Sequence, residues 1–376
     1  MSTPSKKRSY GLDLMRALAI CLVLLAHFAK KIEFLGFWGV EIFFALSGFL
    51  IGDILWRSYS QTDQWNSKYL LNFWKRRWWR TIPNYYLFFI VSIVFALLVY
   101  GELPVINKLI TYLWFGQNLI WPNETFYGVS WSLCIEEWFY LSFPALLFIL
   151  AQFKLKKTLT YSITLFLFIA LAVTSRYILL YFHDEKGIRG ITFARLDAIA
   201  YGVALSFLIA QITLRTQIVC LLAFMGVILM CSPAILAFAN GMSYEELEYN
   251  GIFLALVPLG AAFTLPFLKN IKEPEGIFSI MVKPVTKLSL WSYSIYLSHI
   301  PFLYLGYFLL ENYRSSFLGN FLSKFLGLVL TLIVSALLFK YFEKPFTKMR
   351  PSELKPEASR TAGTDKKDKI GQIPPI

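Results

Sequence analysis

The chain has 376 residues, of which 57% are hydrophobic, 18% aromatic and only 16% charged. Soluble domains average about 25% charged residues, so this composition excludes a water-soluble globular protein. The net charge of +13 does not indicate a nucleic-acid-binding protein, because the basic residues lie mostly between apolar runs and at the chain ends, where membrane proteins carry their cytoplasmic Lys and Arg.

Ten apolar runs predict the fold, because about 20 apolar residues are enough to cross a bilayer as a helix. We therefore expect an all-α, polytopic membrane protein with about ten transmembrane helices around a polar cavity. Lys and Arg concentrate in alternate connecting segments, which predicts that both termini are cytoplasmic. The predicted spans are roughly 11–29, 37–56, 82–100, 133–152, 159–181, 192–212, 217–238, 251–268, 288–310 and 321–341.

Residues 1–349 are predicted to form one membrane domain, and 350–376 a disordered cytoplasmic tail. The tail is rich in Lys, Pro, Ser, Thr and Gly and has too few apolar residues for a core. The four cysteines lie in or beside apolar runs without metal-ligand spacing, so neither a metal site nor a disulfide is predicted.

The first predicted span carries three polar residues that a simple anchor does not need: Asp13, Arg16 and His27. A charged side chain at mid-membrane costs about 2.5–3.5 kcal/mol, so such residues usually face a cavity. Arg16 and His27 are eleven residues apart, which places them on one helical face about 16 Å from each other. His27 is the best acid–base candidate, because imidazole titrates near neutral pH; a histidine at the membrane interface is the alternative.

The second span and the basic stretch that follows it each contain a motif with two interpretations. Gly48 and Gly52 have the spacing that lets another helix approach closely, which favours a role in packing. In KRRWWRT, Arg77 and Arg80 are three apart and share a helical face. They are either part of a positive anchor with an aromatic belt, or an anion-binding pair, since Arg binds phosphates bidentately.

Polar residues also occur in the fourth, sixth and ninth spans. Glu136 and Glu137 point about 100° apart on a helix, so only one can face a given cavity. Arg195 and Asp197 are two apart and cannot pair on their own helix, so either pairing across helices or a catalytic role remains open. His299 is either a packing residue or a cavity residue. These positions predict a shared polar interior, typical of a transporter or an enzyme.

Seven motifs follow one another between positions 10 and 346. They are LDLMRALAICLVLLAH at 12–27, GVEIFFALSGFLI at 39–51, RWWR at 77–80, WSLCIEEWFY at 131–140, RLDAIAYG at 195–202, SYSIYLSHIP at 292–301 and FEKP at 342–345. In this order they resemble the acyltransferase-3 family of integral-membrane acyltransferases. Members O-acylate bacterial polysaccharides, lipopolysaccharide, peptidoglycan and some small molecules.

The resemblance implies an O-acyltransferase, most often an acetyltransferase, of the bacterial inner (cytoplasmic) membrane. The donor would be cytoplasmic acyl-CoA, usually acetyl-CoA, without a metal. The acceptor would be a hydroxyl of a carbohydrate or glycolipid at the outer side, among membrane lipids. The alternative function is a secondary transporter or flippase for a polar or anionic solute, although no internal repeat of the kind common in transporters is found.

The resemblance also implies roles for individual residues. His27 corresponds to the family's essential histidine and would act as general base, with Glu136, rather than Glu137, as the motif carboxylate. Arg16, Arg77 and Arg80 would bind the donor, whose arm would pass Arg16 toward His27. Further cavity candidates are Asp13, Ser47, Tyr140, Arg195, Asp197 and His299, of which Ser47, Tyr140 and Arg195 are alternative oxyanion donors.

Two features depart from the family pattern. Many members have a histidine shortly before WSL, where this chain has GVS at 128–130. Many also carry an outer SGNH hydrolase-like domain, which is not expected here. The transfer would then finish within the membrane domain or pass to a separate protein.

Overall fold

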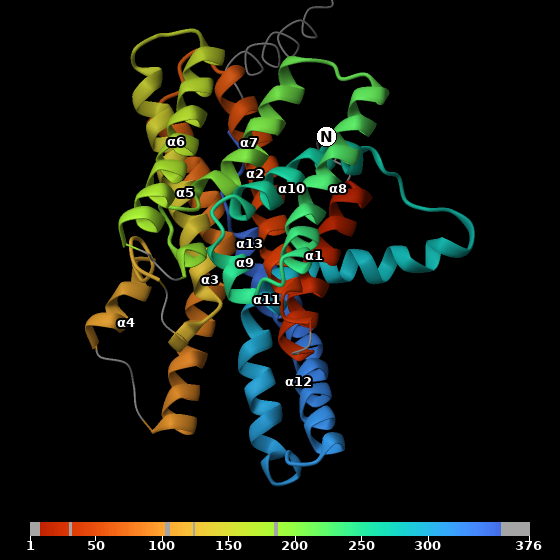
Figure 1. Cartoon of the computed structure of the whole chain (residues 1–376). Helices are drawn as coiled ribbons and strands as arrows, with labels where there is room; N and C mark the ends of the chain where they lie inside the picture. Colours follow the sequence, from red (N-terminus) through yellow and green to blue (C-terminus); the bar gives the residue numbers. More distant parts are fainter. Residues whose placement is uncertain (1–7, 30–31, 102–105, 123–124, 184–186, 355–376) are drawn as a thin grey trace, which may run out of the picture.

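The computed structural model describes residues 8–29, 32–101, 106–122, 125–183 and 187–354 (Figure 1). Helices form the regular secondary structure of these residues, and they contain no strand. The ten predicted spans correspond one to one to long helices. These are α1 (Tyr10–Phe28), α2 (Leu35–Ser60), α3 (Ser67–Tyr100), α5 (Ser130–Ala151), α6 (Lys157–His183), α7 (Leu196–Gln211), α8 (Thr216–Ala239), α10 (Phe253–Asn270), α11 (Val282–Leu309) and α12 (Phe317–Leu338).

The lengths and composition of these helices confirm a multi-pass membrane protein. Eight helices of the described ranges are long and apolar enough to cross a membrane. The 16-residue α7 and the serine-rich α11 are outside that group. Large apolar side chains remain exposed along α8 and α12, for example Phe224 at 63% and Phe325 at 53%, as lipid-facing surfaces require.

The basic stretch 57–81, expected between two spans, is largely helical. The α2 helix continues to Ser60, and α3 begins at Ser67 after Asn66, whose side chain accepts a hydrogen bond from the Lys68 amide. Arg77 and Arg80 therefore lie on the same continuous helix as the third span. A short helix, α4 (Ile106–Leu113), lies in the loop before the fourth span. Two further short helices are α9 (Tyr244–Tyr249) and α13 (Lys344–Lys348).

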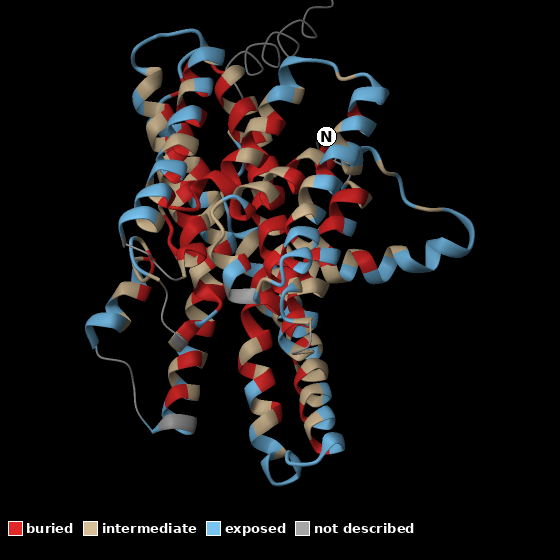
Figure 2. Cartoon of the chain, in the orientation of Figure 1, coloured by how far each residue is buried: buried red, intermediate tan, exposed pale blue. Residues whose placement is uncertain are grey.

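The α2 helix packs closely on α7 through its glycines. A Cβ atom added at Gly48 would lie 1.9 Å from the Ile199 carbonyl oxygen, and one at Gly52 would lie 2.1 Å from the Ser206 hydroxyl. The predicted packing role of this pair is therefore confirmed. Buried residues concentrate in the middle of the assembly, where α2 lies (Figure 2).

The end of the described chain folds back onto α3. The Arg76 guanidinium donates a 2.7 Å hydrogen bond to the Pro351 carbonyl, and the Asn72 side chain donates one of 3.0 Å to Ser352. The predicted tail lies mostly outside the described residues, which stop at Leu354. The cytoplasmic location of both termini and the domain boundary at 349 stay predictions.

Candidate functional site

A polar cavity of about 1610 Å³ lies among α1, α2, α3, α5, α11 and the π-helical turn Phe339–Glu343. A polar interior was expected, and most of the predicted site residues line this one cavity. They are Asp13, Arg16, Ser47, Arg77, Arg80, Glu136 and Tyr140. As the spacing of the adjacent carboxylates required, Glu136 faces the cavity, while Glu137 is buried and does not line it.

Arg16 is held at the cavity by Asp13. The Asp13 carboxylate accepts hydrogen bonds from Arg8 at 2.5 and 2.9 Å and from the Ser289 hydroxyl at 2.7 Å. The Arg16 guanidinium lies 3.5 Å from Asp13 and donates to the Ser289 hydroxyl at 3.2 Å. Asp13 is thus already neutralised by two cations, and its role in this geometry is to position Arg16.

Arg77 and Arg80 bring two further positive charges to the cavity. Neither forms an ion pair with a carboxylate within the described ranges. The Arg77 guanidinium lies over the Tyr140 ring, 4.2 Å from its centroid, and its buried Nε has no hydrogen-bond partner there. Because uncompensated cations beside a membrane core are costly, this pair is suited to bind an anion. Of the two interpretations of the motif, anion binding is therefore supported by geometry.

A chain of three hydrogen-bonded side chains lies on the cavity wall. The Ser47 hydroxyl of α2 is hydrogen-bonded to the Tyr140 hydroxyl of α5. Tyr140 in turn donates a 3.1 Å hydrogen bond to Glu136 Oε2, one turn earlier on α5. A carboxylate, a phenol and an alcohol in this order can pass a proton from Ser47 toward Glu136.

His27 and His299 lie outside the residues that line the cavity, which corrects the expectation that all candidates share it. Their rings meet edge to face, with centroids 4.7 Å apart. The Nδ1 atom of His27 is 2.8 Å from the Val23 carbonyl, and that of His299 is 2.7 Å from the Tyr296 carbonyl. Because a carbonyl only accepts, both Nδ1 atoms carry the hydrogen, and Nε2 of each ring is the basic nitrogen.

A residue of the cavity wall, Tyr296, contacts this histidine pair. Phe43 and Tyr296 line the cavity, and their ring centroids are 6.3 Å apart. The Tyr296 ring is 5.8 Å from that of His299, and the Tyr296 hydroxyl is 2.6 Å from the Ser132 hydroxyl. The expected path from Arg16 to His27 is therefore not contained in this cavity, whose lining includes Tyr296 but not His27.

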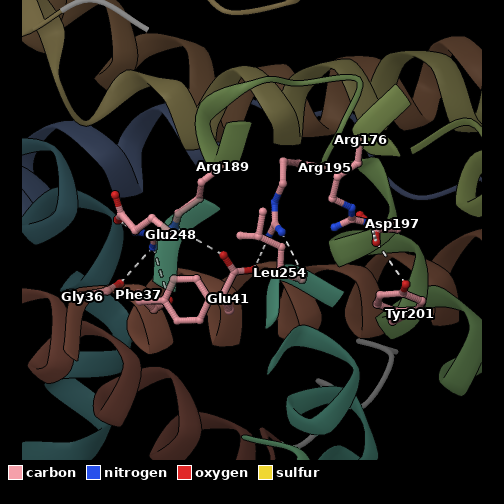
Figure 3. Close-up of polar contacts among 10 residues, drawn as sticks. All are labelled: Gly36, Phe37, Glu41, Arg176, Arg189, Arg195, Asp197, Tyr201, Glu248 and Leu254. Atoms are coloured by element: carbon pink, nitrogen blue, oxygen red, sulfur yellow. Dashed lines mark hydrogen bonds and ion pairs between the residues drawn. The ribbon is translucent and has the colours of Figure 1, made fainter. Parts of the chain in front are cut away.

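Arg195 and Asp197 also lie away from the cavity, in a buried network of charges (Figure 3). Arg195 pairs with Glu41 of α2 and donates a 2.7 Å hydrogen bond to the Leu254 carbonyl. Asp197 pairs with Arg176 of α6. Of the two alternatives, the geometry shows pairing across helices. Arg195 is fully buried and does not line the cavity, so it cannot serve as an oxyanion donor there.

The network extends to the turn before α7. Arg189 lies 3.5 Å from Glu41, pairs with Glu248 and donates to the carbonyls of Gly36 and Phe37 at 3.3 Å (Figure 3). These contacts connect α2, α7, α9 and α10. The network therefore holds α2, the helix that carries Ser47, against α7, α9 and α10.

Replacing Glu41 with Ala is expected to destabilise the fold by about 3–5 kcal/mol, because the buried Arg195 cation would lose its partner. The midpoint of thermal unfolding in detergent measures this effect. Glu311→Ala is the control, since Glu311 is exposed. An unchanged midpoint for Glu41→Ala would contradict a stabilising role of the network.

Sequence reasoning missed several residues of the cavity wall: Ser132, Ser289, Tyr296 and Glu343. Glu343 accepts hydrogen bonds from Ser294 at 2.7 Å and Asn84 at 3.2 Å. The signal was present in SYSIYLSHIP and FEKP, where hydroxyl and carboxyl side chains interrupt apolar helices. Which of them face the cavity depends on helix rotation, and at Glu343 also on the π-helical turn.

Comparisons with known proteins agree with the motifs. A family model described as an acyltransferase domain matches residues 9–340. The chain is 29% identical over 316 residues to O-acetyltransferase OatA of Staphylococcus aureus, covering 78% of this chain and 50% of the relative. It is 28% identical over 362 residues to peptidoglycan O-acetyltransferase OatA of Listeria monocytogenes, covering 92% and 56%. The chain thus spans about half the length of these relatives. No solved structure matches significantly.

Proposed function

Because this chain belongs to the acyltransferase family whose model matches residues 9–340, we propose that it is an O-acyltransferase of the bacterial cytoplasmic membrane. It transfers an acyl group, most simply acetyl, from cytoplasmic acyl-CoA to a hydroxyl of a carbohydrate-type acceptor at the outer side. Both relatives are named O-acetyltransferases, and the name of one includes peptidoglycan, which supports acetyl as the group and a cell-envelope glycan as the acceptor.

The observation that carries this proposal is that Arg77 and Arg80 line a large cavity and form no ion pair with any described carboxylate. Acyl-CoA is a bulky polyanion, and a cavity of about 1610 Å³ has room for it. Arg77 and Arg80 bind its phosphates as bidentate donors, and Arg16, held by Asp13, adds a third cation. The thioester then lies near Ser47, Tyr140 and Glu136, which line the same cavity.

His27 activates the acceptor. Its Nδ1 hydrogen bond to Val23 leaves Nε2 as the nitrogen that removes a proton from the acceptor hydroxyl. With the predicted orientation, the Arg16 end of α1 faces the cytoplasm and His27 lies toward the outside. The donor and the acceptor thus approach from opposite sides, which supports transfer across the membrane domain.

Mass spectrometry of cell-envelope glycans and lipids from cells with and without the gene tests the proposed function. We expect one class of glycan to lose its acetyl group in the deletion strain and to regain it on complementation. Identical acyl profiles, together with uptake of a labelled anionic solute that depends on the protein, would instead favour a transporter.

A further inference from the structure

The geometry points to a covalent step: Ser47 is the nucleophile that takes the acyl group from the donor, so the transfer passes through an acyl-serine. This inference rests on the proposed function and adds an intermediate to it. Its basis is the hydrogen-bonded chain from Ser47 through Tyr140 to Glu136 in the donor cavity.

The order of the hydrogen bonds fixes which atom can attack. The Glu136 carboxylate accepts, so the Tyr140 hydroxyl donates its hydrogen to Glu136. The Tyr140 oxygen is then the acceptor for the Ser47 hydroxyl. With its hydrogen directed toward Tyr140, the Ser47 oxygen has lone pairs available for the thioester carbon. A nucleophile, a base and a group that orients the base are the parts that nucleophilic catalysis needs.

The fold holds Ser47 firmly in this position. Its neighbour Gly48 packs against the backbone of α7 at Ile199, where even a methyl group would collide. Glu41, two turns earlier on α2, is locked into the buried ion network. The opposite face of α2, with Phe43, Ser47 and Leu50, therefore lines the cavity in a fixed register. Such support is what a reacting side chain requires.

Arg77 supplies the positive charge that the step needs. Its guanidinium lies over the Tyr140 ring, 4.2 Å from the centroid, where its positive charge favours transfer of the phenolic proton to Glu136. Its Nε has no hydrogen-bond partner within the described residues and remains available as a donor.

A second serine–tyrosine pair in the cavity lacks these features. Ser132 is 2.6 Å from the Tyr296 hydroxyl, and both line the cavity. In the described ranges no carboxylate accepts a hydrogen bond from Tyr296, and no arginine lies over its ring. The comparison singles out Ser47 as the activated hydroxyl.

The step balances as follows. The Ser47 oxygen bonds to the thioester carbonyl carbon, and the carbon–sulfur bond breaks. The Ser47 proton moves to Tyr140 as the Tyr140 proton moves to Glu136, and the departing CoA thiolate takes that proton. In the second half, the oxygen of an acceptor hydroxyl bonds to the acyl carbon, and the bond between that carbon and the Ser47 oxygen breaks. His27 removes the proton of the acceptor hydroxyl, and this proton passes to the Ser47 oxygen, which restores the free serine and the neutral histidine.

The position of His27 gives this intermediate a purpose. Ser47 lines the donor cavity, whereas His27 lies outside the residues that line it. A covalent intermediate keeps the acyl group on the protein while CoA leaves and the acceptor binds. The kinetic consequence is a ping-pong mechanism, with release of free CoA before the acceptor binds.

The test uses the purified full chain with acetyl-labelled acetyl-CoA and no acceptor, quenched in acid and analysed by peptide mass spectrometry. Wild type should release CoA in a burst of about one per protein and carry acetyl on Ser47. Ser47→Ala should lose the burst and the adduct. Ser47→Cys should carry the acetyl group as a thioester that hydroxylamine cleaves. Such a thioester shows that the cavity of this variant is intact and that the side chain at position 47 reacts with the donor. Tyr140→Phe should slow the burst about 100-fold.

Ser142→Ala is the matched control, because among the described residues this α5 hydroxyl bonds only to the Trp138 carbonyl, and it does not line the cavity. An adduct on Ser132 or His27, or normal acylation of the acceptor by folded Ser47→Ala, would overturn the inference and leave the proposed function standing. Wild-type protein that releases no CoA even with acceptor membranes present would instead refute the proposed function.

Discussion

Replacing His27 with Ala is expected to lower acylation of the acceptor by about 100- to 10,000-fold, the usual contribution of a general base. The variant should fold normally, because the contacts of the wild-type imidazole with described residues are few, namely one backbone hydrogen bond at the last turn of α1 and the ring contact with His299. If transfer passes through Ser47, the burst of CoA release should survive, since His27 lies outside the donor cavity.

Acetyl incorporation into acceptor membranes and the CoA burst, measured on the same preparation, separate these two effects. His27→Gln is the matched variant, because it keeps a polar side chain of similar length but removes the base. Should either variant acylate the acceptor as fast as wild type, His27 would not be the base.

The second large effect is expected in the binding of the acyl-CoA donor. Arg77→Ala and Arg80→Ala should each raise the KM for acyl-CoA by about 10- to 100-fold, which corresponds to a charge-assisted hydrogen bond worth about 1.5–3 kcal/mol. Arg77→Lys should restore only part of the affinity, because an ammonium group lacks the planar fork that binds phosphate bidentately. Arg77→Ala should also lower kcat, since Arg77 lies over Tyr140.

Initial rates at varied acyl-CoA concentration measure this effect, with a dephospho donor analogue as a second probe. Arg215→Ala is the control, because this exposed residue lies at the start of α8 and does not line the cavity. If KM for the donor is unchanged in both variants, the arginine pair does not bind the phosphates.

The sequence predicted the helices well because the physical signal is strong. Each long apolar run must form a helix in lipid, where every backbone polar group needs an internal partner. The start of α3 was misplaced because its first half is basic and rich in tryptophan, and hydropathy does not distinguish such a helix from a loop. The capping residue Asn66 was the local sign that a helix begins there.

The candidate site was predicted as a set of residues, but their connections were not. Glu136 and Tyr140 are four residues apart, so their shared face follows from helical periodicity. Ser47 is 93 positions from Tyr140, and Glu41 is 154 positions from Arg195. Contacts over such separations depend on helix packing, which periodicity does not specify. For the same reason, the position of Tyr296 in the cavity wall and that of His27 outside it appear only in the structure.

Acyl transfer across sealed proteoliposomes tests the central claim most directly. The protein is reconstituted with acetyl-labelled acetyl-CoA on the side of the Arg16 end of α1 and a cell-envelope glycan acceptor only on the other side. The account predicts label esterified to the glycan, dependent on His27 and on Arg77. Label that stays in CoA, or that crosses as acetate or intact acetyl-CoA without acylating the glycan, would contradict it.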